Sequence, residues 1–191
     1  MEYSPTATQL LDAAQEMVQT RGYNAFSYRD LAERVGIRTA SIHYHFPAKS
    51  DLGNALLERY REAVGSALGR ILEEHADAPD RLRAYAALLE GVLTCGDRVC
   101  LGGMLASDFA TLPDEMQRGV TRFIQEHERW LTEVLEQGRA SGTLRFQGPA
   151  GEAATAFFGG LEGAMLVARS CGDLERYRQS ATWLLRGLGA G

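Results

Sequence analysis

Residues 26–49 read FSYRDLAERVGIRTASIHYHFPAK, a pattern typical of two short helices joined by a tight turn. Ser27, followed three residues later by Asp30, predicts a capping box at the start of the first helix. Gly36 predicts the end of that helix, because glycine adopts the left-handed backbone of a C-terminal cap without steric cost. We therefore expect a short helix from about residue 27 to Gly36.

The second short helix is expected over 39–46. Ile42 and Phe46 are four residues apart, so they share one helix face, which we expect to turn inward. The outward side carries hydrogen-bond donors: Arg38, Thr39, Ser41, His43, Tyr44, His45 and, just beyond the helix, Lys49. Such a surface can reach base edges and phosphates together, whereas a solvated helix-turn-helix without a ligand is the alternative. The stretch thus predicts a helix-turn-helix that binds DNA.

Residues 6–60 resemble the N-terminal domain of the tetracycline-repressor (TetR) family. The resemblance is carried by Arg21-Gly22-Tyr23, Phe26-Ser27-Tyr28-Arg29-Asp30-Leu31-Ala32, Gly36, His43-Tyr44-His45-Phe46 and Lys49. It implies that Arg29 and the outward residues of 38–45 contact bases in the major groove. The phosphate contacts that it implies come from Ser27, Tyr44 and Lys49.

Composition predicts helices along the rest of the chain. The 191 residues include 26 Ala and 24 Leu against 8 Val and 4 Ile, which is the usage of helices rather than sheets. Segments of helical periodicity, most of them bounded by prolines or glycines, lie at about 5–21, 27–36, 39–46, 50–75, 79–94, 101–110, 113–140, 149–169 and 173–188. We expect an all-α protein of about nine helices. A helix-turn-helix domain at 1–49 would precede an effector-binding and dimerisation domain at 50–191, with the helix at 50–75 connecting them.

Charge is distributed unevenly. Residues 1–50 contain five basic and five acidic side chains, whereas residues 51–191 contain 15 and 20, which gives the net charge of −5. This acidity does not exclude DNA binding, because a repressor needs only a local basic face. No apolar run approaches the roughly 20 residues of a membrane-spanning helix, and the first ten residues lack a targeting pattern. We expect a cytoplasmic protein without a membrane partner.

Residues 95–170 resemble, less specifically, the effector domain of one TetR branch. That branch includes the repressors of N-ethylmaleimide reductase and of acrylate utilisation. The matching strings are Cys100-Leu101-Gly102-Gly103-Met104, Leu112-Pro113-Asp114, Gly142-Thr143-Leu144 and Gly160-Leu161-Glu162-Gly163-Ala164. The resemblance implies a sensor of reactive electrophiles or acrylate-like ligands, with Cys100 as the cysteine of the motif.

Two cysteines are candidates for sensing. Cys100 is expected at the start of a helix, where partial positive charge favours the reactive thiolate, and Arg98 would act in the same direction. Cys95 lies five residues earlier and is a candidate resolving thiol. The alternatives are an inert buried thiol, which we expect for Cys171, and Cu(I) binding, for which no nearby histidine or third cysteine supplies a ligand.

The helix expected at 113–140 carries a histidine on its apolar stripe. His127 either faces an effector pocket or is a core histidine whose ring nitrogen is satisfied by the backbone. Phe157 and Phe158 are expected to be packing residues. The effector-sensing candidates are therefore Cys95, Cys100, Met104, Phe123, His127 and Trp130.

Small residues are concentrated in the segment 149–169. Glycine weakens a helix on its own, so this concentration predicts close approach by another helix. The TetR resemblance implies that this helix and the one at 173–188 form a four-helix interface between two copies. The expected interface residues are Gly160, Leu161, Gly163, Ala164, Met165, Trp183, Leu184 and Leu188. A homodimer would duplicate the recognition helix for a palindromic operator.

The sequence predicts a ligand-responsive transcriptional regulator, most simply a repressor that a small molecule or electrophile releases from double-stranded operator DNA. The rival class is a cysteine-dependent enzyme with Cys100 as nucleophile and His127 as base. The sequence contains no glycine-rich phosphate loop, no Gly-x-Ser-x-Gly elbow and no clustered metal ligands, so we expect no enzyme, cofactor or metal. A helical adaptor that binds only protein is a third class, and the donors along 38–49 argue against it.

Overall fold

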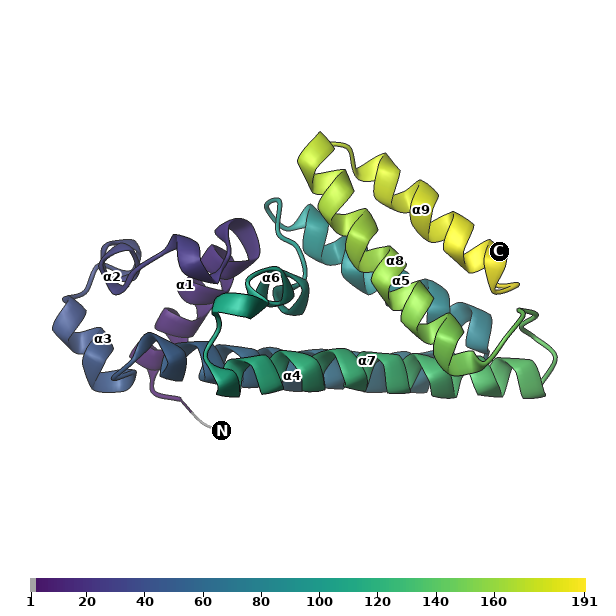
Figure 1. Ribbon diagram of the computed structural model, residues 1–191, viewed down its shortest axis with the longest axis horizontal. Helices are drawn as coiled ribbons and strands as arrows, with labels where there is room; N and C mark the ends of the chain where they lie inside the picture. The colour runs from purple at the N-terminus through teal and green to yellow at the C-terminus, as the bar shows by residue number, and fades with distance from the viewer. Residues whose placement is uncertain (1–2) are drawn as a thin grey trace. The chain divides into compact units, whose positions relative to one another are not determined.

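The computed structural model describes residues 3–191, and all regular elements in that part of the chain are helical (Figure 1). The α-helices are α1 (Pro5–Arg21), α2 (Tyr28–Val35), α3 (Thr39–His45), α4 (Lys49–Glu74), α5 (Ala78–Thr94), α6 (Leu101–Ser107), α7 (Asp114–Ala140), α8 (Ala150–Cys171) and α9 (Leu174–Gly187). Two 3-10 turns are η1 (Tyr23–Ala25) and η2 (Phe109–Thr111). The prediction of an all-α protein of about nine helices is confirmed.

The first two residues of the predicted domain 1–49 lie outside the described residues. Among the helices of residues 3–191, none is both long and apolar enough to cross a bilayer.

The chain forms two compact units that are discontinuous in sequence. One comprises the chain up to Glu62 together with Leu101–Arg122, and the other comprises Ala63–Cys100 together with Phe123–Gly191. We call these the N-terminal unit and the C-terminal unit. The sequence suggested a single division after residue 49 and did not indicate that α6 and the start of α7 associate with the N-terminal helices.

Contacts around Gly22 hold the segment after α6 within the N-terminal unit. The Asp108 carboxylate accepts a hydrogen bond from the backbone N–H of Tyr23 at 2.8 Å. Asn24 Nδ2 donates to Thr111 Oγ1 at 2.7 Å. Gly22 has a φ of +95°, and a Cβ atom there would lie 3.1 Å from Asp108 Oδ2. Glycine is needed at this position both for its backbone conformation and for the close approach of the carboxylate.

The predicted start and end signals of α2 are present. The Asp30 N–H donates to Ser27 Oγ at 3.4 Å, and the Ser27 N–H donates to the Asp30 carboxylate at 2.7 Å, which completes the capping box. The hydrogen bonds with Ser27 lower the pKa of Asp30, so this carboxyl keeps the charge that a helix N-terminus favours. Gly36 has a φ of +76° and donates its N–H to Ala32 O, as a left-handed C-terminal cap requires.

Two helix boundaries differ from the sequence prediction. Helix α4 begins at Lys49 rather than Ser50, because the Asp51 carboxylate accepts the Ala48 N–H at 2.8 Å and starts the helix earlier. The segment predicted as one helix at 101–110 is divided into α6 and η2. The division falls at Asp108, whose carboxylate is engaged outside the helix.

The core of the C-terminal unit joins α5, α8 and α9, and α8 and α9 lie side by side (Figure 1). Tyr177 on α9 is fully buried, and its hydroxyl donates to the carbonyl of Ala86 on α5 at 2.7 Å. A Cβ atom at Gly160 of α8 would lie 2.9 Å from the Leu184 side chain of α9. The absence of a side chain at Gly160 therefore lets the two helices approach closely.

Candidate DNA-binding face and effector site

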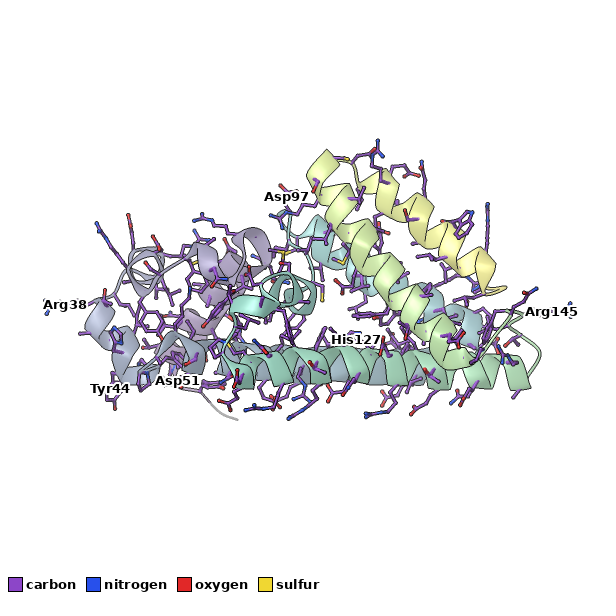
Figure 2. The ribbon with its side chains drawn as sticks, viewed as in Figure 1. Arg38, Tyr44, Asp51, Asp97, His127 and Arg145 are labelled. Carbon is purple, nitrogen blue, oxygen red and sulfur yellow. The ribbon has the colours of Figure 1, made fainter. Side chains whose placement is uncertain are left out.

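The outward side of α3 is exposed to solvent. Figure 2 shows Arg38 and Tyr44 directed away from the helices of the N-terminal unit, and Tyr44 is 83% exposed. The predicted DNA-contacting residues that are exposed are Ser27, Arg29, Arg38, Thr39, His43 and Tyr44, and those that are partly exposed are Ser41, His45 and Lys49. Ile42 and Phe46 are buried, at 0% and 5% exposure, as predicted.

Tyr28 of α2 fixes the position of α3. Its hydroxyl donates to the carbonyls of Phe46, at 2.9 Å, and Ala48, at 2.7 Å. The His43 ring packs edge-on against the Tyr28 ring at 4.9 Å, and His43 Nδ1 lies 3.1 Å from the Pro47 carbonyl, to which it donates. Burial above all raises the pKa of Tyr28, so its hydroxyl remains a donor. Tyr28 is a positioning residue that the sequence analysis did not place among the site residues.

Two of the three residues implied as phosphate ligands use their donors inside the protein. The Ser27 hydroxyl donates to the Asp30 carboxylate at 2.6 Å. The Lys49 ammonium donates to the backbone carbonyls of Tyr23, at 2.6 Å, and Phe26, and it lies 4.5 and 4.2 Å from the centroids of their rings. Desolvation lowers the pKa of Lys49, and nearby carboxylates partly oppose this. Lys49 therefore ties the loop before α2 to the start of α4.

Six ring side chains of α5, α7 and α8 form one cluster in the C-terminal unit: Tyr85, Phe123, His127, Trp130, Phe157 and Phe158. We call it the ring cluster. His127, labelled in Figure 2, lies 4.3 Å from Phe123 and 5.2 Å from Phe158 between ring centroids. Tyr85 stacks on Trp130 at 5.5 Å, and its hydroxyl shares a 2.7 Å hydrogen bond with His127 Nδ1. Three predicted effector residues are thus brought together, and the sequence analysis missed Tyr85 because its apolar helical spacing is that of a core residue.

Three buried polar atoms in and beside the ring cluster have no hydrogen-bond partner among the described residues: His127 Nε2, Trp130 Nε1 and Glu162 Oε1. Leaving a buried polar group unpaired costs about 1–3 kcal/mol, so native structures rarely do so without a reason. Burial lowers the pKa of His127 to about 4 and raises the pKa of Glu162 to about 7. Aromatic side chains with a few buried polar atoms among them are the residue composition typical of a small-molecule site.

The remaining effector candidates, Cys95, Cys100 and Met104, are not members of the ring cluster. Cys100 is 1% exposed, and its thiol donates a hydrogen bond to the Glu162 carboxyl. Cys95 and Cys171 are exposed, so the expectation of a buried thiol at Cys171 is wrong, and in the described part of the chain no cysteine is in a disulfide. Met104 belongs to the N-terminal unit, where its methyl group would lie 3.7 Å from a Cβ atom at Gly22. Of these residues, Cys100 is hydrogen-bonded to Glu162, whose carboxyl group lies beside the ring cluster.

Several of the residues predicted for a dimer interface face the interior of the chain itself. The buried ones are Leu161, Ala164, Met165 and Leu188. Gly160 packs against the Leu184 side chain of the same chain. These residues have little exposed surface to offer a second copy, because α8 turns one apolar side toward its own α5 and α9.

A different side of α8 is exposed. A Cβ atom at Gly163 would have no neighbour within 4 Å, and Leu166 and Val167 are 41% and 52% exposed. The three residues share one helix face by their spacing. On α9, Trp183 is 74% exposed. Of this surface, the sequence analysis anticipated Gly163 and Trp183 and missed Leu166 and Val167, whose apolar character also fits a buried position.

Comparison with known proteins gives consistent results. Residues 10–56 match the family described as bacterial regulatory proteins, tetR family, and residues 78–184 match the tetracyclin repressor-like C-terminal domain. The chain is 27% identical over 163 residues to the transcriptional regulator AcuR of Cereibacter sphaeroides, covering 84% of this chain and 74% of that protein.

Among solved structures, a TetR-family transcriptional regulator from Agrobacterium tumefaciens matches with a TM-score of 0.92 and 36% identity, covering 95% of this chain and 96% of that one. Reduced NemR of E. coli shares the fold, with a TM-score of 0.82, 22% identity and coverage of 96% and 97%.

Proposed function

Because the chain belongs to the TetR family of bacterial regulatory proteins, we propose that it is a homodimeric repressor whose paired α3 helices bind the two halves of a palindromic operator. The observation that carries this proposal is the outward side of α3, a row of exposed donors on a helix that Tyr28 fixes from within. Its relatives are transcriptional regulators, and the cysteine-dependent enzyme is therefore set aside.

The start of α3 is the proposed base-reading end. In helix-turn-helix proteins the first residues of the recognition helix contact base edges, which assigns this role to Arg38 and Thr39, and by position to Ser41. His43, Tyr44 and His45 follow toward the DNA backbone, and Arg29 approaches from α2. Tyr44 is the phosphate ligand best supported by its exposure.

A mobility-shift experiment with the DNA upstream of the protein's own gene tests the proposal. Arg38→Ala should weaken operator binding by roughly 5- to 150-fold, the effect of about 1–3 kcal/mol for a lost base contact, and should affect non-specific DNA less. Arg145→Ala is the matched control, because Arg145 is an exposed arginine of the C-terminal unit. Equal effects of the two substitutions, or no retarded complex with the wild type, would contradict the assignment.

We propose that the dimer forms through the exposed side of α8 with α9, at Gly163, Leu166, Val167 and Trp183. Exposed apolar residues grouped on one helix face are typical of a protein contact. A glycine at the centre of such a face lets a second helix approach closely, as it does at Gly160 within the chain.

We further propose that the effector acts in the C-terminal unit, at the ring cluster and Cys100. The unpartnered buried polar atoms support a bound molecule, and the thiol beside them supports a reactive electrophile. Cys100 is followed directly by α6, and Asp108, at the end of that segment, holds the loop before α2. A change at the thiol therefore has a short path along the chain to the DNA-binding helices.

Cys100→Ser tests the role of the thiol. The variant should bind operator normally and should resist release by N-ethylmaleimide, whereas Cys95→Ser should show a smaller defect, since its thiol is exposed and outside the cluster. Release of the Cys100→Ser protein at wild-type doses would instead favour a non-covalent ligand held by the ring cluster.

A further inference from the structure

Resting on the proposed role of Cys100, we propose that Glu162 is the base that accepts the thiol proton when Cys100 adds to an α,β-unsaturated carbonyl compound. Nothing in the sequence motif itself distinguishes Glu162 from a helical surface carboxylate. Its function is inferred from where α8 places it.

Three structural features are found together at the Glu162 carboxyl group. The Cys100 thiol donates a hydrogen bond to Glu162, and Glu162 Oε1 is buried without a partner among the described residues. Glu162 lies one helical turn after Phe158, so it shares a face of α8 with the ring cluster. His127 of that cluster is 3% exposed and also has an unpartnered ring nitrogen, Nε2. An apolar molecule bound at the cluster would have the thiol and the carboxyl at its edge.

Burial makes a base necessary. The thiolate rather than the thiol is the nucleophile. A thiolate that persists before the electrophile arrives is disfavoured at Cys100, because the site is buried and a neighbouring carboxylate would repel the negative charge. The proton must therefore leave as the sulfur attacks, and the hydrogen-bonded carboxylate is in position to receive it.

The proposed reaction balances without an oxidant or reductant. The Sγ atom forms a bond to the β-carbon of the electrophile while the S–H proton moves to the Glu162 carboxylate. The electron pair of the C=C double bond moves to the α-carbon and carbonyl as an enolate. The protonated Glu162 then returns the proton to the α-carbon, so one S–H bond and one π bond are replaced by one C–S and one C–H bond.

Among the groups near the thiol whose pKa is shifted, Glu162 is the one whose pKa lies near neutral pH. The titratable or charged groups on the elements packed against α8 include Tyr85 and Glu90 of α5, His127 of α7, Tyr177 and Arg178 of α9, and Arg98 in the link before Cys100. His127 is neutral because burial lowers its pKa to about 4, and burial raises the pKa of Tyr177 so that it stays protonated. Glu90 is paired with Arg178 at 2.7 Å. Burial raises the pKa of Glu162 to about 7, which suits a base at cellular pH.

The test is the rate of N-ethylmaleimide addition to Cys100, measured by mass spectrometry of peptides from the full-length protein between pH 5.5 and 8. The wild-type rate should rise with pH along a titration curve whose midpoint lies near pH 7 and should level off above that midpoint. Glu162→Gln should slow addition at pH 7 by roughly 100-fold and remove that midpoint, since the amide cannot accept the proton. Cys95 and Cys171 are exposed and serve as internal controls in the same digest. Glu152→Gln, which removes an exposed carboxylate of α8, is the control substitution.

The outcomes distinguish the proposed role of Glu162 as a base from the proposed signalling through the Cys100 thiol. The role of Glu162 is overturned if Cys100 of the Glu162→Gln protein is alkylated at the wild-type rate. It is also overturned if the alkylation rate of Cys100 in the wild type depends on pH in the same way as that of Cys171. Both conclusions hold whether or not operator is released. The wild-type profile needs no variant, so it remains decisive if Glu162→Gln does not fold. Glu162-dependent alkylation without loss of operator binding would support the base and overturn signalling through the thiol.

Discussion

Lys49 illustrates at the scale of a residue how a side chain's partners determine its role. The family resemblance implies a phosphate contact, yet the ammonium donates to two backbone carbonyls and lies over two aromatic rings. An ammonium has three donors, so two are already committed within the protein. The structure therefore assigns Lys49 first to holding the loop between α1 and α2.

Lys49→Ala should lower the free energy of unfolding by about 1–3 kcal/mol, because it leaves two carbonyls without a charged donor and removes the cation from two rings. Thermal and urea denaturation measure this change. The salt dependence of operator binding should keep its slope, whereas Arg29→Ala, which removes an exposed arginine of α2, should reduce it by about 1. A stable Lys49→Ala protein whose slope falls by about 1 would restore the phosphate role.

His127 makes the stability of the fold sensitive to acid. Its pKa in the folded protein is about 4, below the ordinary 6.5, because burial disfavours the charged ring. Between these values the unfolded chain binds a proton that the folded chain does not, so stability is full above pH 6.5 and falls as pH drops toward 4. Glu162 acts in the opposite sense, since its raised pKa removes stability as pH rises toward 7.

His127→Phe should therefore remove a destabilising contribution of about 2 kcal/mol that His127 makes when the pH falls from 7 to 5. Urea unfolding at both values measures it, and the difference between wild type and variant cancels the contribution of Glu162. If the free energy of unfolding changes equally between pH 7 and pH 5 in both proteins, His127 is not the group responsible for the acid sensitivity.

Helix α8 uses its glycines for two different purposes at the scale of an element. Gly160 admits Leu184 of α9, whereas Gly163 faces open space beside Leu166 and Val167. The sequence pattern treats both glycines as one stripe. The direction in which each position points, set by the packing of α9, divides them between the inside of the chain and its proposed dimer face.

Gly163→Leu should produce a monomer whose melting temperature is close to that of an isolated wild-type subunit, because the new side chain meets only the second copy. Gly160→Leu should instead destabilise the subunit by roughly 1–3 kcal/mol through overpacking against α9. Sedimentation and thermal melting distinguish the two effects. A Gly163→Leu protein that remains dimeric would move the interface elsewhere.

For the whole molecule, the proposed dimer predicts a fixed distance between the two α3 helices on DNA. Half-sites read by a dimer lie about one helical turn, 10–10.5 base pairs, apart or a multiple of it. Once the operator is mapped, insertion of five base pairs at its centre should turn the half-sites to opposite sides of the duplex and reduce affinity to that of a single half-site. Unchanged affinity would show that the subunits bind independently.

The sequence alone was sufficient for the helices and for the DNA-binding motif. Capping at Ser27 and Gly36 and the inward spacing of Ile42 and Phe46 are local signals, in which the residues that interact lie within a turn or two of one another. For the same reason the positions of nearly all helix ends were predicted closely.

Only the tertiary structure decided how those helices share their side chains. The Asp108 contact with Tyr23 spans 85 residues, the Tyr85 contact with His127 spans 42, and the Cys100 thiol reaches Glu162 from another element. Whether a lysine faces DNA or a carbonyl, and whether a glycine faces a neighbour or solvent, depends on the close packing of elements distant in sequence. Local periodicity carries no information about which distant side chain fills a given space.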